Sequence, residues 1–110
     1  SLKAQGVQPP PLPAPRVQVS PLGEQARVAG IKLVRDLRAA EIGATLAFGG
    51  RSLKSQLKGA DKAGIRYALI IGESELTEGN ALAREMATGE QVSVPLAEIA
   101  SWLRGRLDQA

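Results

Sequence analysis

Residues 66–71 constrain the fold more than any other segment, because they are apolar without interruption after Arg66. A short apolar run of this kind, bounded by Gly64 and Gly72, is typical of a strand buried on both faces of a parallel sheet. Parallel strands require crossover connections, which are usually helices. We therefore expect an α/β domain built around this strand.

Amphipathic and extended segments alternate on both sides of the apolar run. In chain order we predict a strand at residues 16–19, a helix at 24–40 stopped at Gly43, a strand at 44–48, a helix at 53–63 capped by Ser52 and stopped by Gly64, the strand at 66–71, a hairpin of 80–86 and 91–94, and a helix opened by Pro95. Alternating β and α units imply right-handed crossovers and a parallel sheet, to which the hairpin adds antiparallel strands.

The first fifteen residues differ in composition from the rest, because they hold five of the seven prolines. Such a stretch favours extended conformations and cannot continue a helix. We predict a linker at residues 1–15, whose first seven residues belong to the end of a preceding element, and a folded domain at residues 16–110.

The composition excludes several kinds of site. The chain contains no cysteine and no histidine, so it can form neither a disulfide, nor a thiolate metal site, nor a catalytic triad based on histidine. Its formal charge of +3 is compatible with nucleic acid binding. It has no signal-peptide core and no apolar run of membrane-spanning length, so a cytoplasmic location is expected.

The helix predicted at residues 53–63 carries the clearest functional pattern. Helical spacing places four cations on one arc, away from the apolar positions: Arg51, Lys54, Lys58 and Lys62. Such a stripe attracts a phosphate backbone, although a solvated helix face is the plain alternative. The helix amino terminus and its preceding glycines also favour anions. A nucleotide phosphate loop is disfavoured, because residues 49–52 lack the Gly-Lys-Ser/Thr order.

Two further segments are candidates for ligand contact. Residues 72–79 are expected to form an acidic loop at the carboxyl end of the central strand, where open α/β sheets place ligand sites. Carboxylates there, such as that of Glu75, can accept hydrogen bonds from bases or merely solubilise the loop. Alternation places Arg84 between Leu82 and Met86 on a mostly apolar face. Its cation therefore pairs with a carboxylate, for which Glu75 is a candidate, or contacts a ligand.

Aromatic residues are scarce, which limits the modes of RNA binding. Only Phe48, Tyr67 and Trp102 are present, too few for the stacking platforms of common RNA-binding folds. Hydrogen bonds and charge would then carry most of any recognition. Trp102 is expected to pack against the core or a neighbouring domain rather than to stack on a base.

Residues 50–64 and 66–76 resemble the signature helix, central strand and following loop of the histidyl-tRNA synthetase anticodon-binding domain. Residues 21–24 and 89–91 match in order, and the resemblance covers about residues 16–107. It implies the three-layer class II anticodon-binding fold, with a mixed five-stranded sheet and three helices. It also implies binding of the tRNA anticodon loop, which is GUG for histidine. The positions that match the family's tRNA contacts are Arg51, Ser52, Lys54, Lys58, Glu75 and Arg84.

The resemblance also sets limits on activity. The class II catalytic motifs, which bind ATP and histidine in this family, are absent, so we expect no cofactor, no metal and no catalytic residue in this chain. The parent enzyme would be a homodimeric histidine–tRNA ligase, and this chain alone would not charge tRNA. Two alternatives remain: a protein-interaction or regulatory module of a synthetase-like paralogue, and a small nucleotide-binding α/β domain.

Overall fold

The apolar run forms the central strand of the sheet. The computed structural model describes residues 16–47 and 52–107, and its five strands lie in the order β2-β1-β3-β4-β5. The strands are β1 (Val17–Pro21), β2 (Ala44–Leu46), β3 (Tyr67–Ile71), β4 (Asn80–Glu85) and β5 (Gln91–Pro95). β1 pairs in parallel with β2 and β3, and β4 pairs antiparallel with β3 and β5. Every residue of β3 is buried, which confirms the prediction for this strand.

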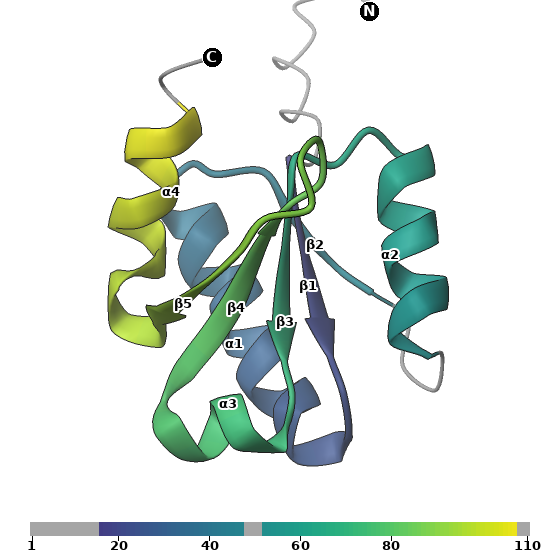
Figure 1. Ribbon diagram of the computed structural model, residues 1–110. Coiled ribbons are helices and arrows are strands. Elements are labelled where there is room, and N and C mark those ends of the chain that lie inside the picture. The colour runs from purple at the N-terminus through teal and green to yellow at the C-terminus, as the bar shows by residue number, and fades with distance from the viewer. Residues whose placement is uncertain (1–15, 48–51, 108–110) are drawn as a thin grey trace, which may run out of the picture.

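Helices cover both faces of the sheet, so the predicted three-layer architecture is confirmed. The helices are α1 (Glu24–Ala39), α2 (Leu53–Lys62), α3 (Glu73–Glu78) and α4 (Ile99–Leu107), with a 3-10 turn at Leu96–Glu98 before α4. Figure 1 shows α1 and α4 on one side of the sheet and α2 on the other. The main core lies between the sheet and the α1–α4 pair, where Val19, Leu37, Leu69 and Leu103 are fully buried.

Local signals account for most helix ends. The Ser55 amide donates to the Ser52 hydroxyl at 3.2 Å, so Ser52 caps α2 as predicted. Gly64 follows α2 with a φ of +73°, which favours glycine. The stop predicted at Gly43 is wrong, because α1 ends at Ala39, four residues earlier, and the chain turns just after that end. There Glu41 adopts a φ of 66°, and the Ile42 amide donates back to the Leu37 carbonyl at 2.9 Å.

The acidic segment after β3 is not a loop, as the sequence predicted, but the short helix α3. Its first turn holds Glu73 and Glu75, whose negative charges are favourable at a helix amino terminus. Gly79 ends the helix in the left-handed conformation, with a φ of 75°. The physical reason for the error is that glycine, a weak capping residue, precedes the helix, while the Glu75 side chain supplies the cap.

Two other predictions concern segments at the edges of the described residues. β2 ends at Leu46, two residues before the predicted end, and Phe48 lies outside the described residues. The linker predicted at residues 1–15 also lies outside them and stays a prediction. No helix within residues 16–47 and 52–107 is long and apolar enough to cross a membrane.

Candidate functional site

The two faces of the sheet differ in chemistry. Side chains that alternate with the core residues point toward α2, and we call this surface the α2 face. Registered pairs form one row across it, from Thr45 on β2 through Gln18 and Ala68 to Arg84 and Gln91. Four of these five side chains are polar or charged. This row is therefore a polar band on the α2 face, whereas the other side of the sheet is the hydrophobic core.

A hydrogen bond from the sheet positions α2. The buried Gln18 side chain donates from Nε2 to the Gln56 backbone carbonyl at 3.0 Å and to the Ser20 hydroxyl at 3.3 Å. Gln56 and Ala60 are the buried residues of α2. Because these residues face the sheet, the helix turns its opposite side to solvent.

That outward side carries the predicted cations. Lys54, Lys58 and Lys62 are all exposed, and we call them the lysine stripe. Within the part of the chain that the structure describes, none of the three has an ion-pair partner. Asp61 is exposed on the same helix and offsets part of this charge. Arg51, the fourth predicted cation, lies outside the described residues.

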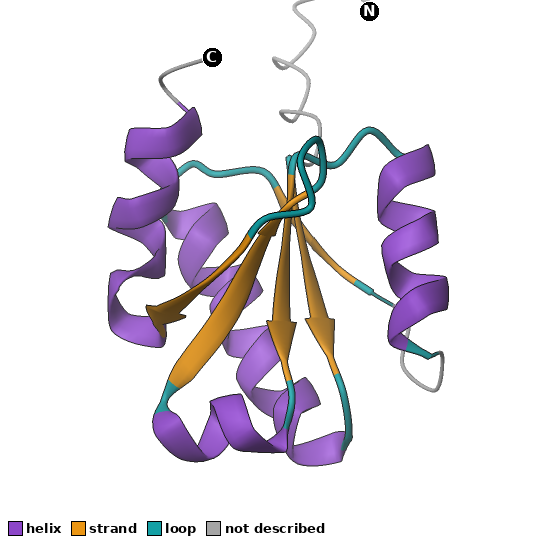
Figure 2. Cartoon of the chain, in the orientation of Figure 1, coloured by secondary structure: helices purple, strands orange, loops and turns teal. Residues whose placement is uncertain are grey.

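One end of the sheet collects several of the predicted positions. β1, β2 and β3 point their carboxyl ends toward the start of α2 and toward α3, as Figure 2 shows. Ser52 therefore lies at the same end of the sheet as Glu75. This is the end at which open α/β sheets place their ligand sites.

Glu75 has a structural role in addition to any contact with a ligand. Its Oε1 atom accepts a hydrogen bond from the Gly72 amide at 2.9 Å. A Cβ atom at residue 72 would lie 2.8 Å from this oxygen, so the carboxylate occupies the space that glycine leaves. Glu75 is half-buried, and one carboxylate oxygen is thus committed to its own helix.

Arg84 shares a face of β4 with Leu82, as the alternation predicted, but this face is not the core side of the sheet. The buried residues of β4 are Ala81 and Ala83, whereas Leu82 and Arg84 point to the α2 face. The Arg84 guanidinium donates from Nη1 to the Gln91 side-chain oxygen at 3.2 Å. Its Nε atom is buried and has no partner among the described residues.

Arg84 and Glu75 do not meet, so Glu75 is not the carboxylate partner of Arg84 that it was a candidate for. Arg84 is registered with Ala68, three residues before the end of β3, whereas Glu75 follows that end. Three residues of a strand span about 10 Å. The acidic and the cationic candidate therefore lie toward opposite ends of the same strand pair.

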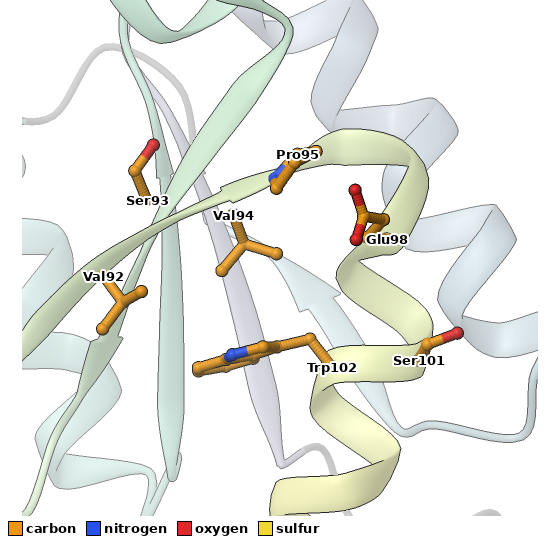
Figure 3. A pocket seen from close by; sticks show the side chains of 7 residues that line it. All are labelled: Val92, Ser93, Val94, Pro95, Glu98, Ser101 and Trp102. Carbon is orange, nitrogen blue, oxygen red and sulfur yellow. The ribbon is translucent and has the colours of Figure 1, made fainter.

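Two of the grooves that described residues line lie beside the sheet. One lies between α2 and the β1–β2 edge, has a volume of about 330 Å³, and is lined by Gln18, Thr45, Leu46, Ala47, Ser55, Gln56 and Gly59. The sequence could not indicate it, because its walls come from three separate elements. The other lies between β5 and α4 and has a volume of about 440 Å³. Figure 3 shows Val92 and Val94 pointing toward Trp102 in this second groove, and Ser93 pointing away.

Trp102 packs against the core, which is one of the two roles that the sequence predicted for it. Its ring meets that of Tyr67 edge-on, with 5.4 Å between centroids and an interplanar angle of 77°. The Arg106 guanidinium lies 4.8 Å from the Trp102 ring centroid. Tyr67 in turn donates to the Glu85 carboxylate at 3.0 Å, and burial together with this carboxylate raises the pKa of Tyr67.

Comparisons with known proteins agree with the resemblance seen in the sequence. Residues 16–106 match the family model described as the anticodon binding domain. The chain is 44% identical over 105 residues to a histidine–tRNA ligase of Symbiobacterium thermophilum, which covers 94% of this chain and 24% of that protein. It is 42% identical over 99 residues to the histidine–tRNA ligase of Dehalococcoides mccartyi, covering 90% of this chain and 24% of the relative.

Solved structures support the same fold. A histidyl-tRNA synthetase from Nostoc sp. matches with a TM-score of 0.81 and 32% identity, over 86% of this chain and 23% of that one. The apo enzyme from S. aureus matches with a TM-score of 0.74 and 28% identity, over 80% of this chain and 23% of that one. The chain spans about a quarter of the length of these relatives. The similarity therefore concerns only that quarter of each relative.

Proposed function

We propose, from the premise that this chain belongs to the anticodon-binding domain family, that it binds the anticodon loop of a tRNA. The relatives that resemble it are histidine–tRNA ligases, so the tRNA that we propose is the histidine tRNA, with anticodon GUG. The single observation that carries this proposal is the lysine stripe of α2, which is exposed beside the polar band of the α2 face.

The lysine stripe suits a phosphate backbone. Helix positions 54, 58 and 62 are four residues apart, so their side chains follow one another along one side of the helix. Cations that contact phosphates release bound counterions, which is the main source of sequence-independent affinity for RNA. In this proposal Lys54 and Lys58 contact the backbone of the loop, and Arg51 and Ser52 contact it at the start of the helix.

Base recognition is assigned to Glu75 and Arg84, both of which are charged and half-buried. Carboxylates and guanidinium groups recognise base edges through directional hydrogen bonds. One oxygen of Glu75 is held by the Gly72 amide, which leaves the other for a base amino group. Arg84 is held by Gln91 through one nitrogen, which leaves further N–H donors for a ligand. Since Arg84 is paired about 10 Å before the end of β3 and Glu75 follows that end, the two residues would contact different nucleotides.

We further propose that the chain serves as the anticodon-binding part of a histidine–tRNA ligase that acts as a homodimer. ATP and histidine would bind to a catalytic part of the enzyme that this chain does not contain. Residues 1–15 would then link the two parts. The described residues contain no group of three or more His, Cys, Asp or Glu side chains that could hold a metal ion.

The proposal is tested by titrating the chain against a fluorescently labelled stem-loop carrying GUG, with the same stem carrying a scrambled loop as control. Tighter binding of the GUG loop at moderate salt is expected. Equal affinity for both loops would reject anticodon recognition. It would favour the alternative, a protein-interaction or regulatory module derived from a synthetase.

A further inference from the structure

The groove between α2 and the β1–β2 edge has the composition of a small-ligand site. Its volume of about 330 Å³ lies within the range of such sites, roughly 300–1,000 Å³. Thr45 and Ser55 contribute hydroxyl groups, each of which can donate and accept a hydrogen bond. Leu46 and Ala47 contribute apolar surface. The lining therefore suits a flat, mostly apolar group with polar edges.

The groove lies next to the lysine stripe. Ser55 and Gly59 form its helical wall, and both are direct neighbours of the stripe on the helix surface. Lys58 is three residues from Ser55, and Lys62 is seven residues from it, which is two turns along nearly the same line. A phosphate held by these lysines would thus have its own nucleotide beside the opening of the groove.

We propose that this groove receives one unstacked base of the bound RNA loop, while Lys58 and Lys62 hold the adjoining phosphates. The inference rests on the proposed function and adds to it a base-binding site outside the positions that match the family's contacts. Bases in single-stranded loops can turn outward into protein pockets, where hydrogen bonds reach their edges. None of the described residues that line the groove is aromatic, so the contacts they can make to the base are hydrogen bonds and van der Waals contacts.

Gly59 is an exposed residue at the wall of the groove. It lies inside α2, where glycine destabilises a helix relative to other residues. A Cβ atom built at this position meets nothing within 4 Å, and the residue itself lines the groove. A side chain introduced here would therefore start in open space at the wall of the groove and cover part of its opening without colliding with the protein. It would also favour the helix.

This property allows a test that separates binding from folding. Gly59→Leu is expected to cover the opening of the groove. Gly105→Leu is the matched control, because Gly105 is an exposed helical glycine of α4 at which a Cβ atom would also meet nothing within 4 Å. Both variants are expected to unfold at the same or a higher temperature than the unmodified chain. Only Gly59→Leu is expected to lose affinity for the GUG stem-loop, by about tenfold. Equal affinity of Gly59→Leu and the control would overturn the groove assignment.

A second series identifies the base. Each loop nucleotide is replaced in turn by an abasic one, and every stem-loop is titrated with the unmodified chain and with Gly59→Leu. One abasic position should weaken binding to the unmodified chain by about tenfold and leave binding to Gly59→Leu unchanged. If the effects of the abasic nucleotide and of the leucine simply multiply at every position, no base occupies the groove. If the unmodified chain binds no RNA loop at all, the proposed function itself fails.

Discussion

Replacing the lysine stripe with alanine should flatten the salt dependence of RNA binding by an amount that the structure sets. The three lysines are exposed, each is free of an ion-pair partner among the described residues, and they follow one another on α2. A contact to a single-stranded phosphate contributes a slope of about 0.7 to the plot of log affinity against log salt. Three contacts give a slope of about 2, so a fourfold rise in salt costs roughly 18-fold in affinity through these residues alone.

Fluorescence anisotropy with a labelled GUG stem-loop between about 50 and 200 mM salt measures this slope. The triple variant Lys54→Ala, Lys58→Ala, Lys62→Ala should lose about 2 from the slope, and each single variant about 0.7. The control is Lys32→Ala, because Lys32 is also exposed but lies on α1, on the other side of the sheet. A triple variant with an unchanged slope, or a control that lowers it equally, would refute the assignment of phosphates to α2.

Three further predictions follow from single contacts. Arg84→Ala and Glu75→Gln should each reduce discrimination between the GUG and scrambled loops by about 1–3 kcal/mol. Discrimination is measured as the ratio of the two affinities, and unchanged ratios in both variants would exclude these residues from base recognition. Ser52→Ala should lower the free energy of unfolding by about 1 kcal/mol in denaturant titration, because it removes the cap of α2, and a neutral result would show that the cap does not stabilise the fold. Burial raises the pKa of Tyr67, so the folded chain retains the phenol proton at pH values where the unfolded chain loses it. The free energy of unfolding should therefore fall as the pH rises above about 10. Tyr67→Phe should reduce this alkaline loss of stability, and an equal loss in both chains would contradict the role of Tyr67.

The elements with strong local signals were predictable from the sequence. The apolar run of β3 indicated a central buried strand, and the hairpin of β4 and β5 followed from alternation and turn residues. Ser52 and Gly64 marked the ends of α2, because a hydroxyl cap and a left-handed glycine act through neighbouring residues only. The exposure of the lysine stripe was also predictable, since helical periodicity alone separates it from the apolar side.

The wrong predictions concern features that depend on a weak sequence signal or on residues far apart in the sequence. α3 escaped prediction because its cap is the Glu75 side chain on a glycine amide. The face shared by Leu82 and Arg84 was wrongly expected to be the mostly apolar one, because the core side of β4 consists of alanines, Ala81 and Ala83, whose hydrophobic signal is weaker than that of Leu82. The α2 groove depends on three elements brought together by the fold, so no local pattern could reveal it.

The most direct test of the central claim, that the α2 face receives the anticodon loop, is amide chemical-shift mapping of the chain titrated with the GUG stem-loop. We predict the largest changes in residues 52–62, at the start of α3, and around Arg84 and Gln91, with small changes in α1 and α4. Changes concentrated in α4 and along the outer edge of β5, with α2 unaffected, would contradict the claim.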